Sequence, residues 1–243
     1  MINTKKDREN LYLRLSNMDI ISRIKPAIQE RRQFNVPWVY TKYIYEARCN
    51  HYHQVFHQTL RRLHSFCYDC WKVDIRPKNL SQMFDLYEYQ RECCNPCKLG
   101  FEMREAVYGL WGGYFYNRSK EEGLERYREV RAFADSLDPE IPVILKRYCT
   151  EFEIGPLSLG PSDKLPELTE AEKEEERKID YHLYGYPQYN TIQPEYVQVH
   201  VMRKWIHWAY QYGDVTYKEF TGGKPLFPTY VTYHQEVKNG GNS

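Results

Sequence analysis

Two pairs of cysteines are the residues of this sequence whose types and spacing most clearly suggest chemistry. Cys67 and Cys70 form one C-x-x-C pair, and Cys94 and Cys97 form another, with 23 residues between the pairs. A two-residue spacing lets both thiolates of a tight turn face a common ion at about 2.3 Å, as tetrahedral zinc requires. The sequence therefore predicts a zinc site held by these four cysteines, with Cys93 as an alternative to Cys94.

A four-cysteine zinc site is expected to be structural. Four thiolates leave no coordination position for water or substrate, and such a site contributes on the order of 10 kcal/mol to folding. A second candidate metal site is the set Cys49, His53 and His57, which share one face of a predicted helix; the simpler interpretation of that set is a polar helix face.

The elements that must position the cysteines follow from the patterning. Alternating apolar and polar residues predict strands at 71–76, 99–104, 107–117 and 142–149, and helices start after Asn79 and Ser119. The order strand, helix, strand, strand, helix, strand predicts a ferredoxin-like (split βαβ) α+β fold, an antiparallel sheet backed by two helices. The first two strands of such a unit start at the same end of the sheet, so the two cysteine pairs can converge there.

Three regions are predicted along the chain. Residues 1–66 form a helical N-terminal extension, and residues 67–153 form the zinc-stapled core. Residues 154–243 contain a linker, an acidic helix interpreted as solvated, an amphipathic helix that starts at Pro194, and a tail, all packing on the core.

Composition excludes some classes of protein. The 243 residues are 42% hydrophobic and 28% charged, as in soluble globular proteins, and no apolar run approaches the roughly 20 residues of a membrane-spanning helix. Seven cysteines are an odd number for a secreted disulfide framework, and five of them lie between residues 67 and 97. With a polar N-terminus, this clustering favours the cytoplasm or another intracellular, reducing compartment. The net charge of +1 excludes a polycation, yet residues 1–100 hold 17 Lys and Arg against 10 Asp and Glu. A basic front half can orient a polyanion or a partner protein.

Strand alternation predicts an open face opposite the two helices. It would carry four cations and four tyrosines, namely Lys72, Arg76, Arg104, Lys146, Tyr108, Tyr114, Tyr116 and Tyr148. Aromatic rings stack bases and cations hold phosphates, so this face predicts binding of single-stranded nucleic acid, RNA in particular. The segment Gly-Gly-Tyr-Phe-Tyr at 112–116 resembles the RNP1 segment of RNA-recognition motifs over these five residues, without its leading Lys/Arg-Gly pair. That resemblance implies tyrosines that stack bases.

The leading hypothesis is therefore a zinc-stabilised nucleic-acid-binding protein without enzymatic activity. One alternative is a structural or protein-interaction subunit, including a homo-oligomer, whose 23 tyrosines serve contact surfaces; Trp205 and Trp208 of the amphipathic helix would then cover the tyrosine face. A further alternative is a metal-dependent nucleotidyl-transfer or nuclease enzyme that uses Asp74 and Glu102. Basic residues flank both acids, which favours ion pairing over metal binding.

Overall fold

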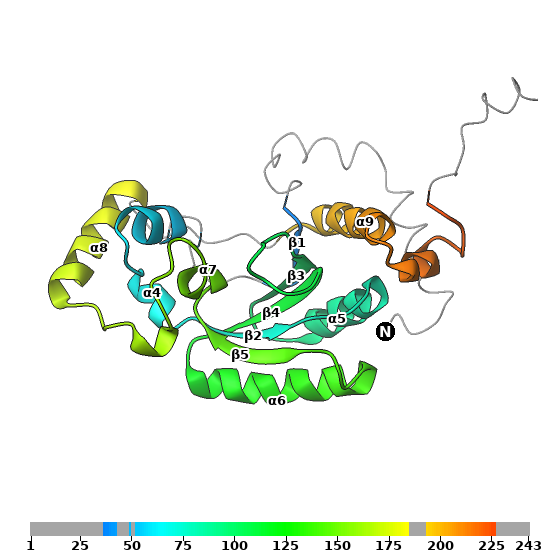
Figure 1. Cartoon of the computed structure of the whole chain (residues 1–243), viewed down its shortest axis with the longest axis horizontal. Coiled ribbons are helices and arrows are strands. Elements are labelled where there is room, and N and C mark those ends of the chain that lie inside the picture. The colour runs from blue at the N-terminus through cyan, green and yellow to red at the C-terminus, as the bar shows by residue number, and fades with distance from the viewer. Residues whose placement is uncertain (1–35, 43–48, 50–51, 185–192, 227–243) are drawn as a thin grey trace, which may run out of the picture.

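The computed structural model describes residues 36–42, 49, 52–184 and 193–226. The fold is mixed α+β and is built on a five-stranded antiparallel sheet with the strand order β1-β3-β4-β2-β5 (Figure 1). The strands are β1 (Trp38–Tyr40), β2 (Trp71–Ile75), β3 (Cys97–Phe101), β4 (Trp111–Asn117) and β5 (Val143–Arg147).

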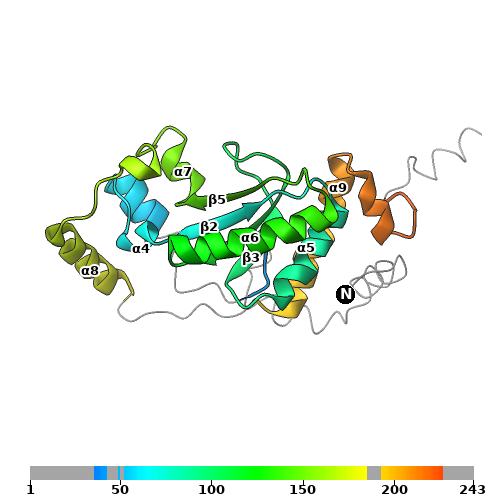
Figure 2. The same cartoon turned by 90° about the horizontal axis from the view of Figure 1, so that it is seen from below.

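Two helices between the strands cover one face of the sheet. They are α5 (Leu80–Glu92) and α6 (Lys120–Leu137), and both lie in front of the strands in Figure 2. The Asn79 side chain accepts a hydrogen bond from the Gln82 amide (2.9 Å), and the Ser119 hydroxyl accepts one from the Glu122 amide (3.2 Å). These bonds satisfy donors that the first turn of a helix leaves unpaired, so both predicted caps are confirmed.

The main core lies between these helices and the sheet. Val73, Leu99 and Phe115 point into it and are completely buried. Helix α9 (Glu195–Gln211) and the short 3-10 helix η4 (Val215–Phe220) extend this core on the same side of the sheet. Trp205 packs on Phe84 of α5, with ring centroids 6.1 Å apart.

Trp208 packs on Phe101 at 4.6 Å. The two tryptophans of α9 therefore lie on the helix side of the sheet and do not cover the tyrosines, contrary to the alternative considered above.

Strand β1 was not anticipated, because three residues are too few to show an alternating pattern. It pairs with β3 through Val39 and Leu99, at the edge of the sheet and within the stretch predicted to be a helical extension. Residues 1–35 of that predicted extension lie outside the described residues. The close approach of β1 depends on Gly100, since a Cβ there would lie 2.3 Å from the Pro37 carbonyl oxygen.

A second, smaller group of helices lies together at one end of the sheet, on the left of Figures 1 and 2. Its members are η2 (Tyr52–Thr59), α4 (Ser65–Tyr68), α7 (Thr150–Glu153), η3 (Ser162–Lys164) and α8 (Glu170–Tyr184). Phe56, Leu63 and Phe152 form its separate apolar core.

The acidic helix α8 belongs to this second group. Its Asp180 carboxylate lies 2.9 Å from His64 Nε2, and Glu176 accepts a hydrogen bond from the Ser65 amide at 2.9 Å. One side of α8 is therefore docked on α4, where the sequence suggested a solvated helix. In the described part of the chain, no helix combines the length and apolarity needed to cross a membrane.

Candidate functional site

The face of the sheet opposite α5 and α6 is here called the polar face. It carries Lys72 and Asp74 of β2, Arg76 directly after β2, and Tyr114 and Tyr116 of β4. These side chains alternate with the core residues, as the pattern predicted. They are nevertheless only 4–7% exposed, so the prediction of an open platform is wrong for them. Alternation specifies which side chains share a face but does not specify what covers that face.

The other four residues predicted to bind nucleic acid differ in exposure. Tyr148 is buried. Tyr108 is 81% exposed on the loop between β3 and β4, whereas Arg104 and Lys146 are partly buried. The eight predicted residues therefore do not form one accessible surface.

Arginine side chains cross-link the carboxylates of the polar face. Arg76 Nη2 donates to Asp74 Oδ2 at 2.6 Å, and Arg104 Nη2 donates to Glu102 Oε2 at 2.7 Å. The Tyr114 hydroxyl also donates to Glu102 Oε2, at 3.1 Å. The Arg76 guanidinium lies directly against Gly112, where a Cβ would be 2.5 Å from Nη1.

The electrostatics of these carboxylates follow from their surroundings. Burial alone would raise the pKa of Glu102, but the hydrogen bonds and charge of Arg104 lower it to about 2. Burial raises the pKa of Asp74 despite its contact with Arg76. The ion pairing expected of these two acids is confirmed: both oxygens of Glu102 and Oδ2 of Asp74 bind guanidinium groups, whereas the buried Asp74 Oδ1 has no hydrogen-bond partner among the described residues.

Lysines on the polar face lack a matching number of acids. Lys98 Nζ lies 4.3 Å from the Trp38 ring centroid and 5.4 Å from that of Tyr114, and burial lowers its pKa to about 8. Lys146 donates to the Thr150 hydroxyl at 2.6 Å, and burial lowers its pKa as well. Among the described residues of this region, cations outnumber carboxylates; they are Lys72, Arg76, Lys98, Arg104 and Lys146 against Asp74, Glu102 and Glu151.

The structure does not bring the two C-x-x-C pairs together. Cys97 pairs with Phe115 across the strands on the helix side of the sheet, and its Sγ lies 3.0 Å from the Thr41 hydroxyl. Cys94 is exposed. Cys70, by contrast, packs with Tyr114 and Tyr116 on the polar face. The strands start at the same end of the sheet, as expected, but the thiols of Cys70 and Cys97 lie on opposite faces.

The alternative for the second pair, Cys93, is also engaged elsewhere, since its thiol donates to the Tyr89 carbonyl oxygen at 3.3 Å.

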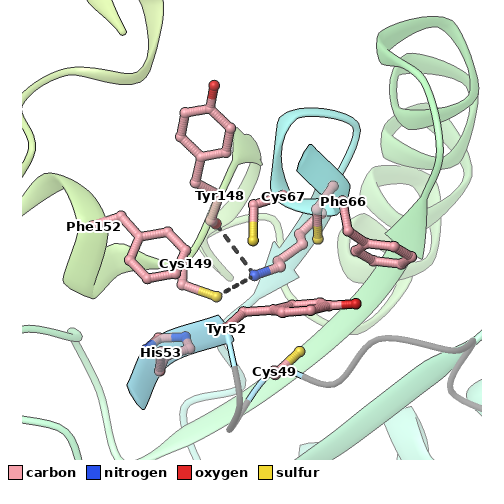
Figure 3. Close-up of a pocket in the computed structure, with 10 residues that line it drawn as sticks. Cys49, Tyr52, His53, Phe66, Cys67, Tyr148, Cys149 and Phe152 are labelled. Atoms are coloured by element: carbon pink, nitrogen blue, oxygen red, sulfur yellow. Dashed lines mark hydrogen bonds between the residues drawn. The ribbon is translucent and has the colours of Figure 1, made fainter. Parts of the chain in front are cut away.

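The first pair instead shares a pocket with other sulfurs. Cys49, His53, Cys67, Cys70 and Cys149 line a cavity of about 10 Å³, here called the thiol pocket (Figure 3). The ammonium of Lys72 reaches into it, 2.9 Å from Cys149 Sγ and 3.3 Å from the Tyr148 carbonyl oxygen. Burial would raise the pKa of Cys149, but the Lys72 charge and a hydrogen bond with His53 lower it to about 6.

Sequence reasoning missed Cys149, although a signal was available. It is the final residue of the last predicted strand, and the strand observed there, β5, neighbours β2, which begins directly after Cys70. His57, the last member of the Cys49, His53 and His57 set, turns to a different partner: its Nε2 lies 2.8 Å from the Leu157 carbonyl oxygen. The described residues contain no group of three or more His, Cys, Asp or Glu side chains already arranged to hold a metal ion.

A groove of about 400 Å³ opens beside the loop between β3 and β4, and is here called the loop groove. Phe101, Met103, Leu110 and Tyr212 contribute its apolar lining, and Glu102 and Arg104 contribute its polar lining. Phe101 and Tyr212 are in contact, with ring centroids 5.3 Å apart.

Comparison of the chain with protein-family models, curated proteins and solved structures gave no match.

Proposed function

We propose that this chain is a protein-interaction subunit that assembles through the loop groove. The observation that carries the proposal is the exposure of large apolar side chains around it: Met103 is 69% exposed, Tyr108 81% and Tyr212 59%. Single exposed apolar residues are ordinary, whereas several around one concave site are typical of contact surfaces. Tyrosine and methionine are also enriched at such surfaces.

The arrangement favours a second copy of the chain as the occupant. Tyr108 lies between Val107 and Gly109, which both line the groove, and its own ring projects into solvent. In a twofold dimer the same patch meets itself, so Tyr108 of each copy can reach the groove of the other. The groove volume is sufficient for an aromatic side chain.

Sedimentation velocity over a range of protein concentrations tests this assembly. The wild type is expected to associate, and Tyr108→Ser is expected to weaken association at least tenfold, about 1.4 kcal/mol. Tyr181→Ser is the matched control, since Tyr181 is 67% exposed on α8 in the other helical group. A wild type that stays monomeric at every concentration, or equal effects of the two substitutions, would refute the proposal.

Binding of single-stranded nucleic acid is a second candidate, favoured by the excess of cations on the polar face. Because this face is buried, binding there requires its covering segments to move, and the bound phosphates would then pair with lysines such as Lys98 and Lys146. Fluorescence anisotropy with labelled single-stranded RNA and DNA at low and moderate salt tests it, since phosphate contacts make affinity fall steeply with salt. Binding that is insensitive to salt, or lost in neither Lys98→Met nor Lys146→Met, contradicts this candidate.

We also propose that residues 71–147 form a ferredoxin-like unit to which β1 is added at one edge. The chain order β2, α5, β3, β4, α6, β5 and the neighbour order β3-β4-β2-β5 support this proposal. It predicts the slowest amide exchange in β2 and β4, the two inner strands. The seven cysteines all lie within the described residues and form no disulfide there, which supports a reducing compartment.

A further inference from the structure

Three separate chain segments meet at the thiol pocket, and the backbone holds two of them together. Cys67 and Cys70 lie in one turn, closed by a hydrogen bond from the Cys70 amide to the Cys67 carbonyl oxygen at 3.1 Å. The Tyr148 amide in turn donates to the Cys70 carbonyl oxygen at 3.1 Å. Arg147 Nε donates to the Tyr68 carbonyl oxygen at 2.7 Å. The backbone just before Cys149 is thus fastened to the turn that carries the C-x-x-C pair.

The conformation of Tyr148 is a second, independent observation. Its φ is 64°, in the left-handed region that a residue with a large side chain adopts at an energetic cost. Tyr148 lies in the turn between the end of β5 and the start of α7. This turn directs the next side chain, Cys149, into the pocket toward Lys72 Nζ (Figure 3). The backbone strain is therefore located where the chain brings in a third sulfur.

His53 reaches the pocket from η2. Its ring packs on Phe152 of α7, with centroids 4.5 Å apart, and it lines the pocket beside Cys149. A nitrogen ligand is therefore adjacent to a sulfur ligand. Cys49 also lines the pocket, and it is the alternative fourth ligand that an experiment must exclude.

Size and charge indicate what the pocket can hold. A cavity of about 10 Å³ accommodates one water-sized particle and leaves no room for an organic substrate. Three thiolates, one neutral imidazole and one divalent cation carry a net charge of −1, which the Lys72 ammonium neutralises. A divalent metal in a Cys₃His set thus makes the buried pocket electrically neutral, whereas four thiolates would leave it negative.

We infer that Cys67, Cys70, Cys149 and His53 bind one structural Zn²⁺ ion. Thiolate and imidazole ligands in a closed tetrahedral set select zinc. In this structure the Lys72 ammonium lies among the sulfurs, so the proposed site requires the cysteine side chains to rotate about Cα–Cβ and the Lys72 tip to move aside. Lys72 then remains available to donate to the Cys149 sulfur. The metal would tie η2 and α7 to the start of β2, and this inference is independent of the proposed assembly.

Metal content and cobalt substitution of the full-length protein test the site. We expect one zinc per chain by elemental analysis, and a tetrahedral thiolate spectrum after replacement with Co²⁺. Cys149→Ser is expected to lose this metal, while Cys94→Ser retains it. The pair of variants separates this ligand set from one made of both C-x-x-C pairs, because only the latter contains Cys94.

Two further variants identify the fourth ligand. His53→Gln is expected to lose or shift the cobalt spectrum, and Cys49→Ser to leave it unchanged. If Cys149→Ser does not fold, His53→Gln and thermal melting of the wild type with and without a chelator still test the site, since removal of a structural metal lowers Tm. A wild type without stoichiometric zinc and without a tetrahedral cobalt spectrum overturns the inference. So does loss of metal in Cys94→Ser with retention in Cys149→Ser.

Discussion

The two faces of the sheet are built in opposite ways. On the helix side, Val73, Leu99 and Phe115 pack against α5, α6 and α9 in a largely apolar core, which also buries Gln90. On the polar face, Arg76 and Glu102 take part in a buried network of ion pairs, and Lys72 lies among thiols. The core side chains of both faces are buried, yet apolar packing stabilises one, whereas the other holds ion pairs together with lysines that lack a matching carboxylate.

The difference matters because buried charge is costly unless every group is paired. An apolar core tolerates small changes in proportion to the volume removed, whereas a charge network fails when one member loses its partner. Natural chains rarely place so many ionisable side chains behind a sheet without a functional reason. The polar face is therefore where a single substitution should most readily leave a buried charge without its partner.

The largest effect is expected from removing apolar volume on the helix side. Phe115→Ala should lower the free energy of unfolding by about 3–5 kcal/mol, because it leaves a cavity beneath α5. Ile144→Ala, at a side chain 52% exposed on edge strand β5, is the control and should cost less than about 1 kcal/mol. Urea denaturation measures both. Similar losses in the two variants would show that the helix side is not the dominant core.

The contribution of the ion-pair network to the free energy of unfolding can be measured at Glu102. The pKa of this carboxyl is about 2 in the folded chain against an ordinary 4.5, so it stabilises the fold above pH 4.5 and loses that contribution as the pH falls toward 2. The difference corresponds to about 3 kcal/mol. Glu102→Gln should therefore destabilise by about this amount at pH 7.

Denaturant unfolding of wild type and Glu102→Gln from pH 7 to pH 2 tests whether the stabilisation by Glu102 is lost as the pH falls. The gap in free energy should be widest at neutral pH and should narrow between pH 4.5 and pH 2. A gap that stays constant over this range would mean that Glu102 contributes by packing and not by its charge.

The charge of Lys98 is expected to lower the stability of the fold, whereas the charge of Glu102 raises it. Burial lowers its pKa from an ordinary 10.5 to about 8, so below pH 8 the fold bears the cost of a buried charge. Between pH 8 and pH 10.5 the folded chain loses this proton before the unfolded chain does, and stability rises with pH. Lys98→Met should therefore be more stable than wild type by about 1–3 kcal/mol at pH 7.

Thermal and urea unfolding from pH 7 to pH 10.5 measure the effect, with Lys120→Met on the exposed start of α6 as the control. The advantage of Lys98→Met should shrink above pH 8. A variant less stable than wild type at pH 7 would show that the aromatic rings of Trp38 and Tyr114 stabilise the ammonium more than burial costs.

The smallest effect is expected at the loop groove. Tyr108→Ser should change the free energy of unfolding by no more than about 0.5 kcal/mol, because the side chain is almost fully exposed. The same urea titration that measures Phe115→Ala detects it. A larger loss would place Tyr108 in the folded core of the monomer and would weaken its assignment to an assembly surface.

Much of the central fold could be predicted from local patterns. The cap residues Asn79 and Ser119 hydrogen-bond in the way their side-chain chemistry requires, and the alternation in β2 separates Val73 from Lys72 on opposite faces. The candidate site could be predicted only in part. Cys67 and Cys70 were found through their spacing, whereas Cys149 is 79 residues from Cys70 and gave no motif of its own.

The sequence by itself located the strands of residues 71–147, the two helices between them and most of the side chains that share each face, because these depend on neighbours a few residues apart. It extended two strands too far, since residues 102–110 form the loop between β3 and β4. Only the tertiary structure decided that the polar face is covered, that β1 joins the sheet at Gly100, and that Cys97 lies on the face opposite Cys70. These features arise from contacts between segments far apart in the chain. Such contacts depend on how packed elements exclude water and neutralise charge, and no local pattern of residues records them.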